Sequence, residues 1–464
     1  MKIAIIGGGI SGLSLAYFLM QNGKTDLAVL EAADRPGGKI RTEKAEGYLC
    51  EWGVNGFLDN RPRTIETART VGLRVLRSSD SSRKRFVFLG GRLELLPEGP
   101  KAFLASRVLG PLGKLRIALE PFVPAGGEED ETLAHFAIRR LGRQAYENLI
   151  DPMASGIFAG DPEKMSVQSC FPKIKAMERK YGSLIKAMIS LGRQARKGAK
   201  RDQSQRDQSR TVGAGPGGVL SSFSGGMEEL IHALEATLGG KLKTGFRVDG
   251  IERIFSPSGG GYRVHGGGGS PLEADALVLA CPAYEASRIL SDFDKDLSGL
   301  VGAIQYPPVS VISLGFAREK ITFPVDAFGF LIPFKEGRKV LGVLYESSVF
   351  PERAPEGHVL LRVMAGGARA AALALLDDEK LPGLVMDELR HMLGLKAEPE
   401  MVRIFRHEKA IPQYPPGHAE RLEKIGEALA KAPGLFITGN AFRGISMNDC
   451  IENSHALARN IASL

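Results

Sequence analysis

The chain has 464 residues, 43% of them hydrophobic, and a formal net charge of +8 from 61 Lys plus Arg against 53 Asp plus Glu. This balance excludes a disordered or fibrous protein, and the length predicts more than one folding unit. Cys50, Cys170, Cys281 and Cys450 stand far apart without a CxxC pair, which excludes a disulfide scaffold and a Cys-rich zinc site and fits a reducing compartment.

The N-terminal segment imitates a signal peptide, because apolar residues follow Met1 and Lys2. Gly7, Gly8 and Gly9 interrupt that run, and no small-residue cleavage site follows at the usual distance. No stretch of the sequence reaches the roughly 18 uncharged apolar residues of a membrane-spanning helix. We therefore expect folded structure here and a cytoplasmic protein.

The first thirty residues predict a strand, a Gly-rich turn, a helix and a second strand. Ile3 to Ile6 and Leu27 to Leu30 are short apolar runs, typical of parallel strands buried on both faces, and Ser11 to Gln21 is predicted to be a helix. This arrangement predicts a βαβ unit.

The turn carries the spacing Gly7-x-Gly9-x-x-Gly12. In such a turn the first Gly permits a tight bend, the second lets the backbone approach a pyrophosphate, and the third allows close packing of helix on strand. The free N–H groups at the helix N-terminus favour phosphate binding. Glu31, at the end of the second strand, is placed to accept hydrogen bonds from ribose hydroxyls. Strand, turn, helix and acid together predict a dinucleotide site, against a ligand-free Gly-rich turn as the alternative.

Helical periodicity dominates from residue 91 to residue 200, as at Leu133 to Leu141 and Tyr146 to Ser155. Between Lys101 and Phe122, cationic and apolar residues are interleaved. That pattern fits a membrane surface or a partner groove, but equally a core helix with solvated Lys and Arg. Residues 193 to 210 are basic and polar without an apolar period, so we expect a solvated loop there and, without aromatic residues, no nucleic acid binding.

A second Gly pattern, Gly213-x-Gly215-x-x-Gly218, follows this loop and not a strand, contains Pro216 and lacks a downstream acid. We interpret it as a loop. The chain is therefore expected to hold one dinucleotide and not NADPH together with a flavin.

The remaining chain mixes helices and strands. Met227 to Leu238 is predicted to be a helix, and the β-rich runs between residues 307 and 366 are typical of an antiparallel sheet. The predicted strands are Phe246 to Phe255, Gly261 to His265, Ala276 to Ala280, Val309 to Phe316, Phe328 to Ile332, Val340 to Tyr345 and Val359 to Met364. The chain closes with a strand that starts at Leu435 and a helix from Asp449 to Ile461.

Arg35-Pro36-Gly37-Gly38-Lys39-Ile40-Arg41-Thr42 follows Glu31 closely and resembles the extended dinucleotide signature of FAD-containing amine oxidases and their relatives. The two Gly residues let the backbone pass close to the diphosphate, and Lys39 or Arg41 can neutralise phosphate charge. FAD is therefore favoured over NAD.

Longer segments resemble the oxygen-dependent protoporphyrinogen oxidase family over nearly the whole chain. They are Phe328 to Pro333, Leu341 to Pro355, Ala410 to His418 and Gly439 to Ile451. The resemblance implies an FAD enzyme of haem synthesis that oxidises protoporphyrinogen IX to protoporphyrin IX in three two-electron steps, with oxygen as the final acceptor. It also implies peripheral association with the inner face of the cell membrane, through the segment 101 to 122, and allows a homodimer.

The resemblance implies a set of cofactor-binding residues, matched one position at a time. They are Gly7, Gly8, Gly9, Ile10, Ser11, Gly12, Glu31, Ala32, Gly38, Lys39, Arg41, Gly53, Val54, Asn55, Gly56, Val248, Gly439, Ile445, Ser446 and Met447. Val248 is expected on the adenine side, and Gly53 to Gly56 with Ile445 to Met447 beside the flavin ring.

For the substrate, the resemblance implies that Arg85 pairs with a propionate, that Leu331 and Leu341 clamp one pyrrole ring, and that Met364 faces another. Gly329 is expected beside the bridge carbon that is oxidised. Surface exposure of Arg85 and plain core packing of the three apolar residues are the alternatives. One departure is His407, which stands where many relatives have a Trp near the flavin.

No nucleophile, obligatory acid–base residue or metal-ligand set is apparent, which fits a reaction in which the flavin does the redox work. Coproporphyrinogen III oxidation on the same fold is the nearest alternative. An FAD amine oxidase and a flavin-free binding protein of the same architecture are more distant ones.

The expected fold class is α/β, with a split Rossmann-like FAD-binding domain, a mixed-sheet substrate domain and a helical membrane-docking domain. We assign residues 1–90, 211–285 and 426–464 to the FAD-binding domain, 91–210 to the helical domain and 286–425 to the substrate-binding domain.

Overall fold

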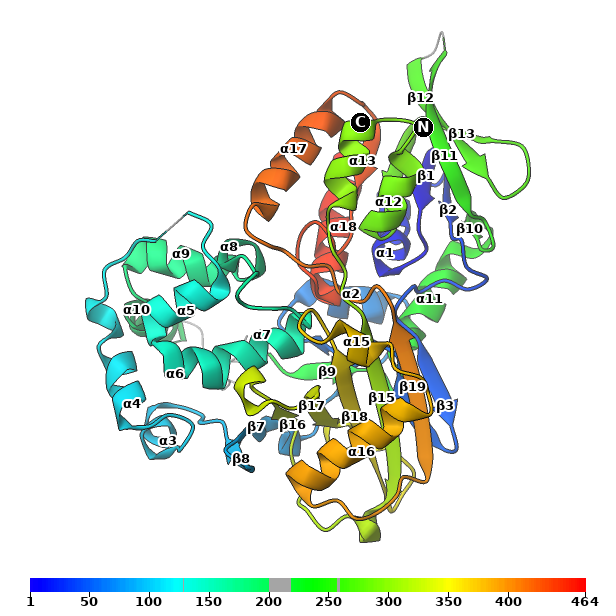
Figure 1. Ribbon diagram of the computed structural model, residues 1–464. Coiled ribbons are helices and arrows are strands. Elements are labelled where there is room, and N and C mark those ends of the chain that lie inside the picture. The colour runs from blue at the N-terminus through cyan, green and yellow to red at the C-terminus, as the bar shows by residue number, and fades with distance from the viewer. Residues whose placement is uncertain (128, 200–217, 257–258) are drawn as a thin grey trace.

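The protein is described here by a computed structural model, which covers residues 1–127, 129–199, 218–256 and 259–464. Figure 1 shows a parallel sheet in the upper part of the molecule, a larger sheet below it, and a group of helices to one side. The Gly213 to Gly218 pattern lies outside the described residues except for Gly218 itself.

The parallel sheet joins strands from distant parts of the chain. Its order is β10-β2-β1-β14-β20, and all four pairings are parallel. The strands are β1 (Ile3–Ile6), β2 (Leu27–Leu30), β10 (Leu242–Lys243), β14 (Ala276–Leu279) and β20 (Leu435–Ile437). Both faces are covered, and β1, β2, β14 and β20 are apolar throughout, as their sequences predict, whereas the edge strand β10 ends with the exposed Lys243.

Helices pack on one face of this sheet, and helices together with a small antiparallel sheet pack on the other. The first face is covered by α1 (Ile10–Gln21), α2 (Pro62–Thr70), α11 (Glu228–Leu238) and α18 (Met447–Ala462). The second is covered by α12 (Ala283–Leu290), α13 (Lys295–Gly302), α17 (His418–Ala430) and strands β11 (Val248–Ser256), β12 (Gly259–Gly266) and β13 (Leu272–Ala274).

The larger sheet has seven strands in the order β19-β15-β18-β17-β16-β7-β8. They are β7 (Arg85–Leu89), β8 (Arg92–Leu95), β15 (Val309–Ala317), β16 (Gly329–Leu331), β17 (Val340–Tyr345), β18 (His358–Gly366) and β19 (Met401–His407). The pairings between β15 and β18 and between β17 and β18 are antiparallel, which confirms the expected antiparallel core, whereas β16 pairs with β7 in parallel.

The two faces of the seven-stranded sheet differ in what covers them. Helix α16 (Lys380–Leu393) packs on one face through Leu381, Val385 and Leu389. The hairpin of β3 (Thr42–Ala45) and β4 (Tyr48–Glu51) packs on the other, where Trp52 and Met364 belong to the same apolar cluster. We call this second face the hairpin face.

Short elements complete the connections. They are β5 (Phe57–Leu58), β6 (Leu76–Arg77), β9 (Leu220–Ser222), α14 (Glu346–Val349), α15 (Ala371–Ala374), and the 3₁₀ turns η1 (Asp80–Arg83), η2 (Glu120–Phe122), η5 (Gly239–Lys241), η6 (Arg318–Lys320), η7 (Phe334–Glu336) and η8 (Pro351–Arg353).

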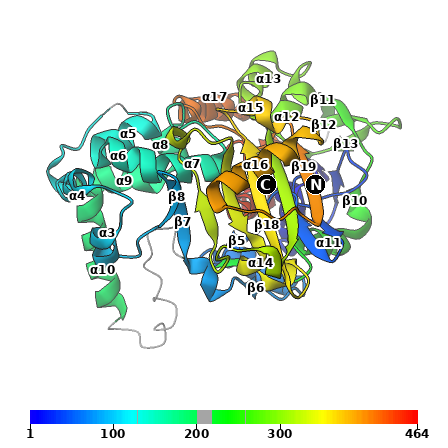
Figure 2. The same ribbon diagram turned by 60° about the horizontal axis from the view of Figure 1, so that its bottom comes forward.

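Residues 100–199 form the helical region, which extends to one side of the sheets in Figure 2. Its helices are α3 (Pro100–Ala105), α4 (Pro111–Ala118), α5 (Leu133–Leu141), α6 (Arg143–Ala145), a π-helical turn (Tyr146–Ile150), α7 (Asp151–Phe158), α8 (Val167–Cys170), α9 (Pro172–Tyr181) and α10 (Leu184–Ala199).

The loop predicted over residues 193–210 is wrong for its first seven residues, since α10 continues to Ala199. Arg and Lys are strong helix formers and extend a helix that an apolar segment has started, even where their own sequence lacks an apolar period. The rest of that prediction lies outside the described residues.

Candidate active site

The Gly-rich turn lies at the carboxyl edge of the parallel sheet, between β1 and α1. A Cβ atom added to Gly12 would lie 1.9 Å from the carbonyl oxygen of Gly7, so only Gly allows α1 to start this close to β1. A Cβ added to Gly9 would meet no described atom within 4 Å, so space is open above this residue. The turn thus packs tightly at Gly12 and leaves open space at Gly9, which is the space that a bound pyrophosphate requires.

The start of α1 is free to bind an anion. Among the described residues no side chain caps it, and its first turn contains no acidic residue. The N–H of Gly8 donates to Glu31 over 2.6 Å, and the N–H of Ala33 donates to the same carboxylate over 2.8 Å. These two bonds hold Glu31 at the carboxyl edge, where the phosphates and ribose of a dinucleotide would lie.

The Gly37–Gly38 loop runs alongside the turn. Gly37 donates its N–H to the carbonyl of Gly8 over 2.8 Å, and Gly9 pairs with Gly37 in a parallel bridge. Arg35 holds this loop in place, because its guanidinium donates to the Gly38 carbonyl over 3.0 Å and to Glu228 over 3.2 Å. This role of Arg35 carries no signal in the sequence.

Val248 approaches the same edge at the start of β11. Phe246, two residues before it, donates its N–H to the carbonyl of Glu31 over 2.8 Å. Val248 itself is buried, and its carbonyl accepts a bond from Arg288 over 2.6 Å. The structure therefore brings Glu31, predicted to bind the ribose, close to Val248, which is expected on the adenine side.

The segment Gly53 to Gly56 leads from β4 towards β5. The side-chain nitrogen of Asn55 is buried and has no hydrogen-bond partner among the described residues, and the indole N–H of the neighbouring Trp52 is in the same situation. A buried donor without a partner costs free energy, so a ligand acceptor is expected here. A flavin, with its carbonyl and ring-nitrogen acceptors, fits this requirement.

Lys39 and Arg41 contact protein groups and not the Gly-rich turn. The ammonium of Lys39 donates to the carbonyl of Ala410 and lies 5.1 Å from the ring centroid of Tyr306. Burial lowers the pKa of Lys39 to about 8. The guanidinium of Arg41 lies 4.0 Å from the ring centroid of Trp52. Both cations therefore lie toward the segment expected beside the flavin ring.

His407 takes part in the same surroundings. Its Nε2 atom lies 2.9 Å from the carbonyl oxygen of Trp52, so this nitrogen carries the proton and donates. Burial, opposed by that hydrogen bond, lowers the pKa of His407. A neutral His therefore supports the segment that leads to Gly53.

The C-terminal segment Gly439 to Met447 follows β20 and ends at the start of α18. Ser446 caps α18 by accepting a bond from the Asp449 N–H over 3.1 Å. Helix α18 packs on α1, and Ser454 donates to the carbonyl of Ser11 over 2.8 Å. The starts of α1 and α18, both expected to contact FAD, thus belong to one packed unit.

The residues expected to contact substrate come together through strand register on the hairpin face. One row across the sheet pairs Arg85 with Gly329, Gly329 with Leu344, and Leu344 with Arg362. The next row pairs Leu331 with Gly342 and Gly342 with Met364. Opposed residues in paired strands share a face, so Arg85, Gly329, Leu331 and Met364 form one surface.

Leu341 reaches this surface through an irregularity. The register of β17 shifts between Val340 and Gly342, a bulge that re-aims the side chain between them. Leu341 packs with Val309, Ala410 and Ile411, and the carbonyl of Ala410 is the acceptor for Lys39. The expected substrate surface therefore adjoins the expected flavin surface.

Four buried charged residues next to this surface were given no role from the sequence. Arg362 donates to the carbonyl of Gly53, and Arg353 pairs with Glu51 over 3.0 Å. Neither carboxylate oxygen of Glu346 has a hydrogen-bond partner within the described residues. Their spacing along the chain carries no signal, since only the fold brings residues 51, 346, 353 and 362 together.

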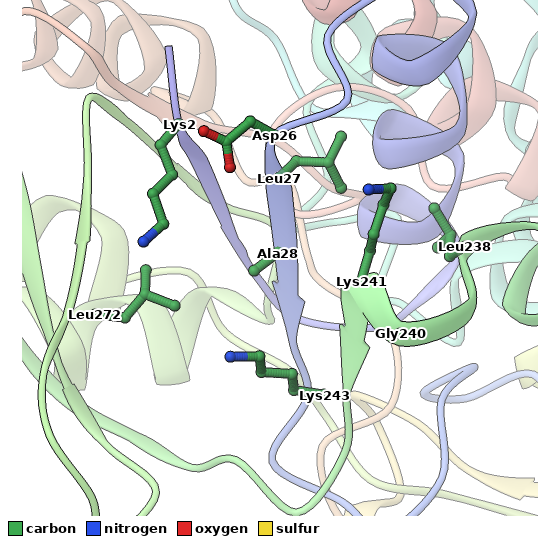
Figure 3. Close-up of a pocket in the computed structure, with 9 residues that line it drawn as sticks. All are labelled: Lys2, Asp26, Leu27, Ala28, Leu238, Gly240, Lys241, Lys243 and Leu272. Carbon is green, nitrogen blue, oxygen red and sulfur yellow. The ribbon is translucent and has the colours of Figure 1, made fainter.

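A cavity of about 450 Å³ lies elsewhere, and Figure 3 shows the residues that line it. Lys2, Asp26 and Leu27 line it at the beginnings of β1 and β2, whereas the Gly-rich turn follows the end of β1. It is therefore separate from the candidate active site. Within residues 1–127, 129–199, 218–256 and 259–464, no helix is long and apolar enough to span a bilayer, and no cluster of His, Cys, Asp and Glu is arranged to hold a metal.

Comparisons with known proteins agree with this geometry. The family model described as flavin containing amine oxidoreductase matches residues 10–462. Protoporphyrinogen oxidase of Oryza sativa chloroplasts is 33% identical, covering 99% of this chain and 87% of the relative. Coproporphyrinogen III oxidase of Bacillus subtilis is 30% identical, covering 98% and 96%.

Solved structures of other proteins superpose on this chain over nearly its whole length. A provisionally assigned protoporphyrinogen oxidase from Exiguobacterium sp. 255-15 superposes with a TM-score of 0.83 at 25% identity, covering 100% of this chain and 98% of that one. Cyclohexylamine oxidase from Brevibacterium oxydans superposes with a TM-score of 0.72 at 18% identity, covering 100% and 98%, and shares the fold.

Proposed function

Because the chain belongs to the flavin containing amine oxidoreductase family, we propose that it oxidises protoporphyrinogen IX to protoporphyrin IX in three two-electron steps. It is an FAD-dependent oxidoreductase, so the flavin-free binding protein is not retained as an alternative. When bound, FAD accepts the two electrons removed in each step and passes them to oxygen.

One observation carries the proposal: strand register aligns the residues expected to contact substrate on a single face that adjoins the segment Trp52 to Gly56. Leu331 and Met364, in one row, offer apolar surface to a tetrapyrrole, and Arg85 lies at the β7 end of the neighbouring row. An exposed guanidinium can bind a carboxylate with two parallel hydrogen bonds. The surface thus suits a flat apolar ring with an acidic substituent at its edge.

The chain's own residues position the substrate and limit access of water. Helix α7 approaches the row closely, since a Cβ added to Gly156 would lie 2.6 Å from a methyl carbon of Leu331. Asp151, at the start of α7, accepts the Phe334 N–H over 2.9 Å and thereby fixes the helix to the end of β16. The helical region therefore covers one side of the proposed substrate surface.

No side chain is proposed as an obligatory acid or base. Aromatisation of the macrocycle drives the reaction, so no base is required, and the pyrrole protons would leave to solvent. If substitution of one polar residue near Gly329 abolished flavin reduction while substrate binding persisted, this part of the proposal would be wrong.

Coproporphyrinogen III is the second candidate substrate, favoured by the B. subtilis relative, which is covered nearly end to end. It carries two more propionates than protoporphyrinogen, and each would require a cationic or polar partner. The proposal of protoporphyrinogen rests on the apolar residues Leu331, Leu341 and Met364, which suit vinyl groups.

The test is anaerobic mixing of the purified yellow protein with each porphyrinogen, and with a primary amine, while flavin absorption is recorded. We expect rapid bleaching by protoporphyrinogen and slower bleaching by coproporphyrinogen. Faster bleaching by coproporphyrinogen would make coproporphyrinogen the preferred substrate and protoporphyrinogen the alternative. Bleaching by the amine alone would overturn the proposal.

We also propose that the helical region docks on a membrane surface. Among the described residues there, the most exposed large apolar side chains are Leu112 at 82%, Phe122 at 81% and Leu104 at 69%. Lys101 and Arg107 are exposed beside them, whereas Val108 and Leu109 are buried. Exposed apolar residues flanked by cations suit the interface of an anionic bilayer, from which a poorly soluble tetrapyrrole can enter.

A further inference from the structure

A buried charge cluster lies directly behind the segment expected beside the flavin ring. It contains two carboxylates and two guanidiniums, all at least nine-tenths buried: Glu51, Glu346, Arg353 and Arg362. Such groups are rarely buried unless they are paired, so their arrangement needs an explanation.

Arg362 connects the cluster to the flavin segment. It lies in the same row of the seven-stranded sheet as Gly329, and its Nη2 atom donates to the carbonyl of Gly53. Its Nε atom is buried without a partner in the described part of the chain. The cation is therefore fixed at the backbone that is proposed to line the flavin.

Glu346 is the buried carboxylate that can balance this cation. It opens α14, immediately after β17, and its two oxygens are buried without hydrogen-bond partners in the portion of the chain described. Burial raises the pKa of Glu346, and Arg362 and Arg353 oppose that rise. Glu51, by contrast, is already bonded to Arg353, Met227 and Thr42.

We propose that Glu346 is a positioning residue that sets the reduction potential of the flavin through Arg362. When ionised, its carboxylate offsets the positive charge of the guanidinium behind Gly53. Reduction places negative charge on the flavin, so an uncompensated cation nearby favours the reduced form. The inference rests on the proposed placement of the flavin beside Gly53 and not on the identity of the substrate.

Protonation of Glu346 gives the cluster a pH dependence. Helix α14 packs against β18, η8 and η1, and lies near β4. The charged or titratable groups that face it are Arg362, Arg353, Glu51 and Cys50, while Asp80 and Arg83 of η1 form their own exposed pair at 3.0 Å. At low pH a protonated Glu346 leaves Arg362 unbalanced, as a Gln would.

The experiment measures the flavin midpoint potential of the purified holoprotein between about pH 5 and about pH 9, which spans the range of a carboxyl group with a raised pKa. At the alkaline end we expect Glu346→Gln to shift the equilibrium about tenfold toward the reduced flavin, or ~30 mV for a two-electron couple. At the acid end the wild type and the variant should coincide, because the wild-type carboxyl is then neutral.

Three further variants make the result decisive. Glu388→Gln changes a buried Glu on α16, paired with Arg338 at 3.6 Å, and should leave the potential unchanged. Glu346→Asp keeps the charge and should keep the wild-type pH profile. Arg362→Gln removes the cation and should shift the potential in the opposite direction, which provides a test even if Glu346→Gln loses its flavin.

A constant offset between the wild type and Glu346→Gln at every pH, or no offset at any pH, would overturn the inference. Equal shifts in Glu346→Gln and Glu388→Gln would do the same. The potential requires only bound FAD, so a protein that shows the predicted shift but fails to oxidise porphyrinogen would contradict the proposed function alone.

Discussion

The parallel-sheet region and the helical region place apolar and charged residues in opposite ways. Around the parallel sheet, the interior is apolar, with Ile3, Ile5, Leu13 and Val29 fully buried. In the helical region the interior contains a network of ionised side chains, whereas Leu112 and Phe122 face outward. The first region thus buries its apolar side chains, whereas the second leaves several large apolar side chains exposed.

The buried network of the helical region is continuous. Arg139 bonds Glu131 over 2.6 Å and Glu178 over 2.8 Å, and Lys175 bonds Glu131 over 2.7 Å. Arg140 bonds Glu120 in the same network. Charges that are paired in this way fix one packing geometry but add little net stability. The helical region therefore combines directional ion pairs with an apolar core that includes Leu133, Phe136 and Phe158, while the parallel-sheet region is held by apolar area.

The largest effect is expected from a substitution in the Gly-rich turn of the parallel-sheet region. In Gly12→Val, the added Cβ would collide with the Gly7 carbonyl, so α1 must shift away from β1. We expect a colourless protein and a loss of oxidase activity of more than about 100-fold, corresponding to at least ~2.7 kcal/mol of transition-state stabilisation. Visible absorption of the purified protein reads out bound flavin.

Gly426→Ala is the matched control. Gly426 lies in α17, and a Cβ there meets no described atom within 4 Å. Ala in a helix is favoured over Gly by about 1 kcal/mol, so this variant should stay yellow and unfold at a slightly higher temperature. A yellow, active Gly12→Val would contradict the assignment of the turn.

The second prediction concerns a substitution that destabilises the helical region. In Arg140→Met, Glu120 loses its buried partner, and carbonyls that accept from Arg140, including those of Val123 and Gly182, lose a donor. We expect a loss of about 3–5 kcal/mol of stability confined to this region. Hydrogen exchange should show faster exchange there, with the flavin retained.

The control for this variant is Arg143→Met, which removes an exposed Arg 3.7 Å from Glu147. Exposed pairs contribute about 0–1 kcal/mol, so exchange should hardly change. Faster exchange throughout the molecule in Arg140→Met would show that the two regions are not independent.

The third prediction concerns the outward apolar residues. In Leu112→Asp and Phe122→Asp, we expect binding to vesicles that contain anionic lipid to weaken at least about tenfold, because each side chain would otherwise bury apolar area worth about 1.5–3 kcal/mol. Sedimentation with vesicles measures the effect. Leu375→Asp, at an exposed apolar residue outside the helical region, should bind as the wild type does.

The contrast also explains what the sequence could predict. The prediction was correct for strands β1, β2 and β14 and for helix α1. Strands that are buried on both faces have short apolar sequences, and the Gly spacing indicates a turn in which the backbone approaches its neighbours closely. The ion network of the helical region could not be predicted, since Glu120, Arg140 and Glu178 look like ordinary surface charges in the sequence. Their burial depends on how the helices pack.

The candidate site shows the same division. Cofactor-binding roles for residues near one another in sequence, such as Gly7 to Gly12 with Glu31, could be predicted from spacing alone. The alignment of Arg85 with Gly329 depends on a parallel pairing across 244 positions, which no periodicity reports. Resemblance supplied those residues, whereas Arg362 and Glu346 were found only in the folded protein.

The fourth prediction tests the substrate row at its exposed end. In Arg85→Leu we expect KM for the porphyrinogen to rise about tenfold with kcat little changed, because a charge-assisted hydrogen bond contributes about 1.5–3 kcal/mol to binding. Arg92→Leu is the control, since Arg92 is exposed on the adjacent β8 and pairs with Glu94 over 2.6 Å. A fall in kcat with unchanged KM would argue against propionate binding by Arg85.

The smallest effect is a difference in how the two regions respond to pH. Burial raises the pKa of Glu131, but bonds from Arg139 and Lys175 outweigh it and hold this pKa below its ordinary value. The stability from Glu131 is therefore present above the ordinary carboxyl pKa and is lost as the pH falls below it. Burial raises the pKa of Glu51 to about 7, so its cost appears as the pH rises from about 4.5 toward about 7. Hydrogen exchange should therefore show acid loosening the helical region first. Raising the pH from about 4.5 to about 7 should weaken the β3–β4 hairpin, and Glu51→Gln should remove that second response alone.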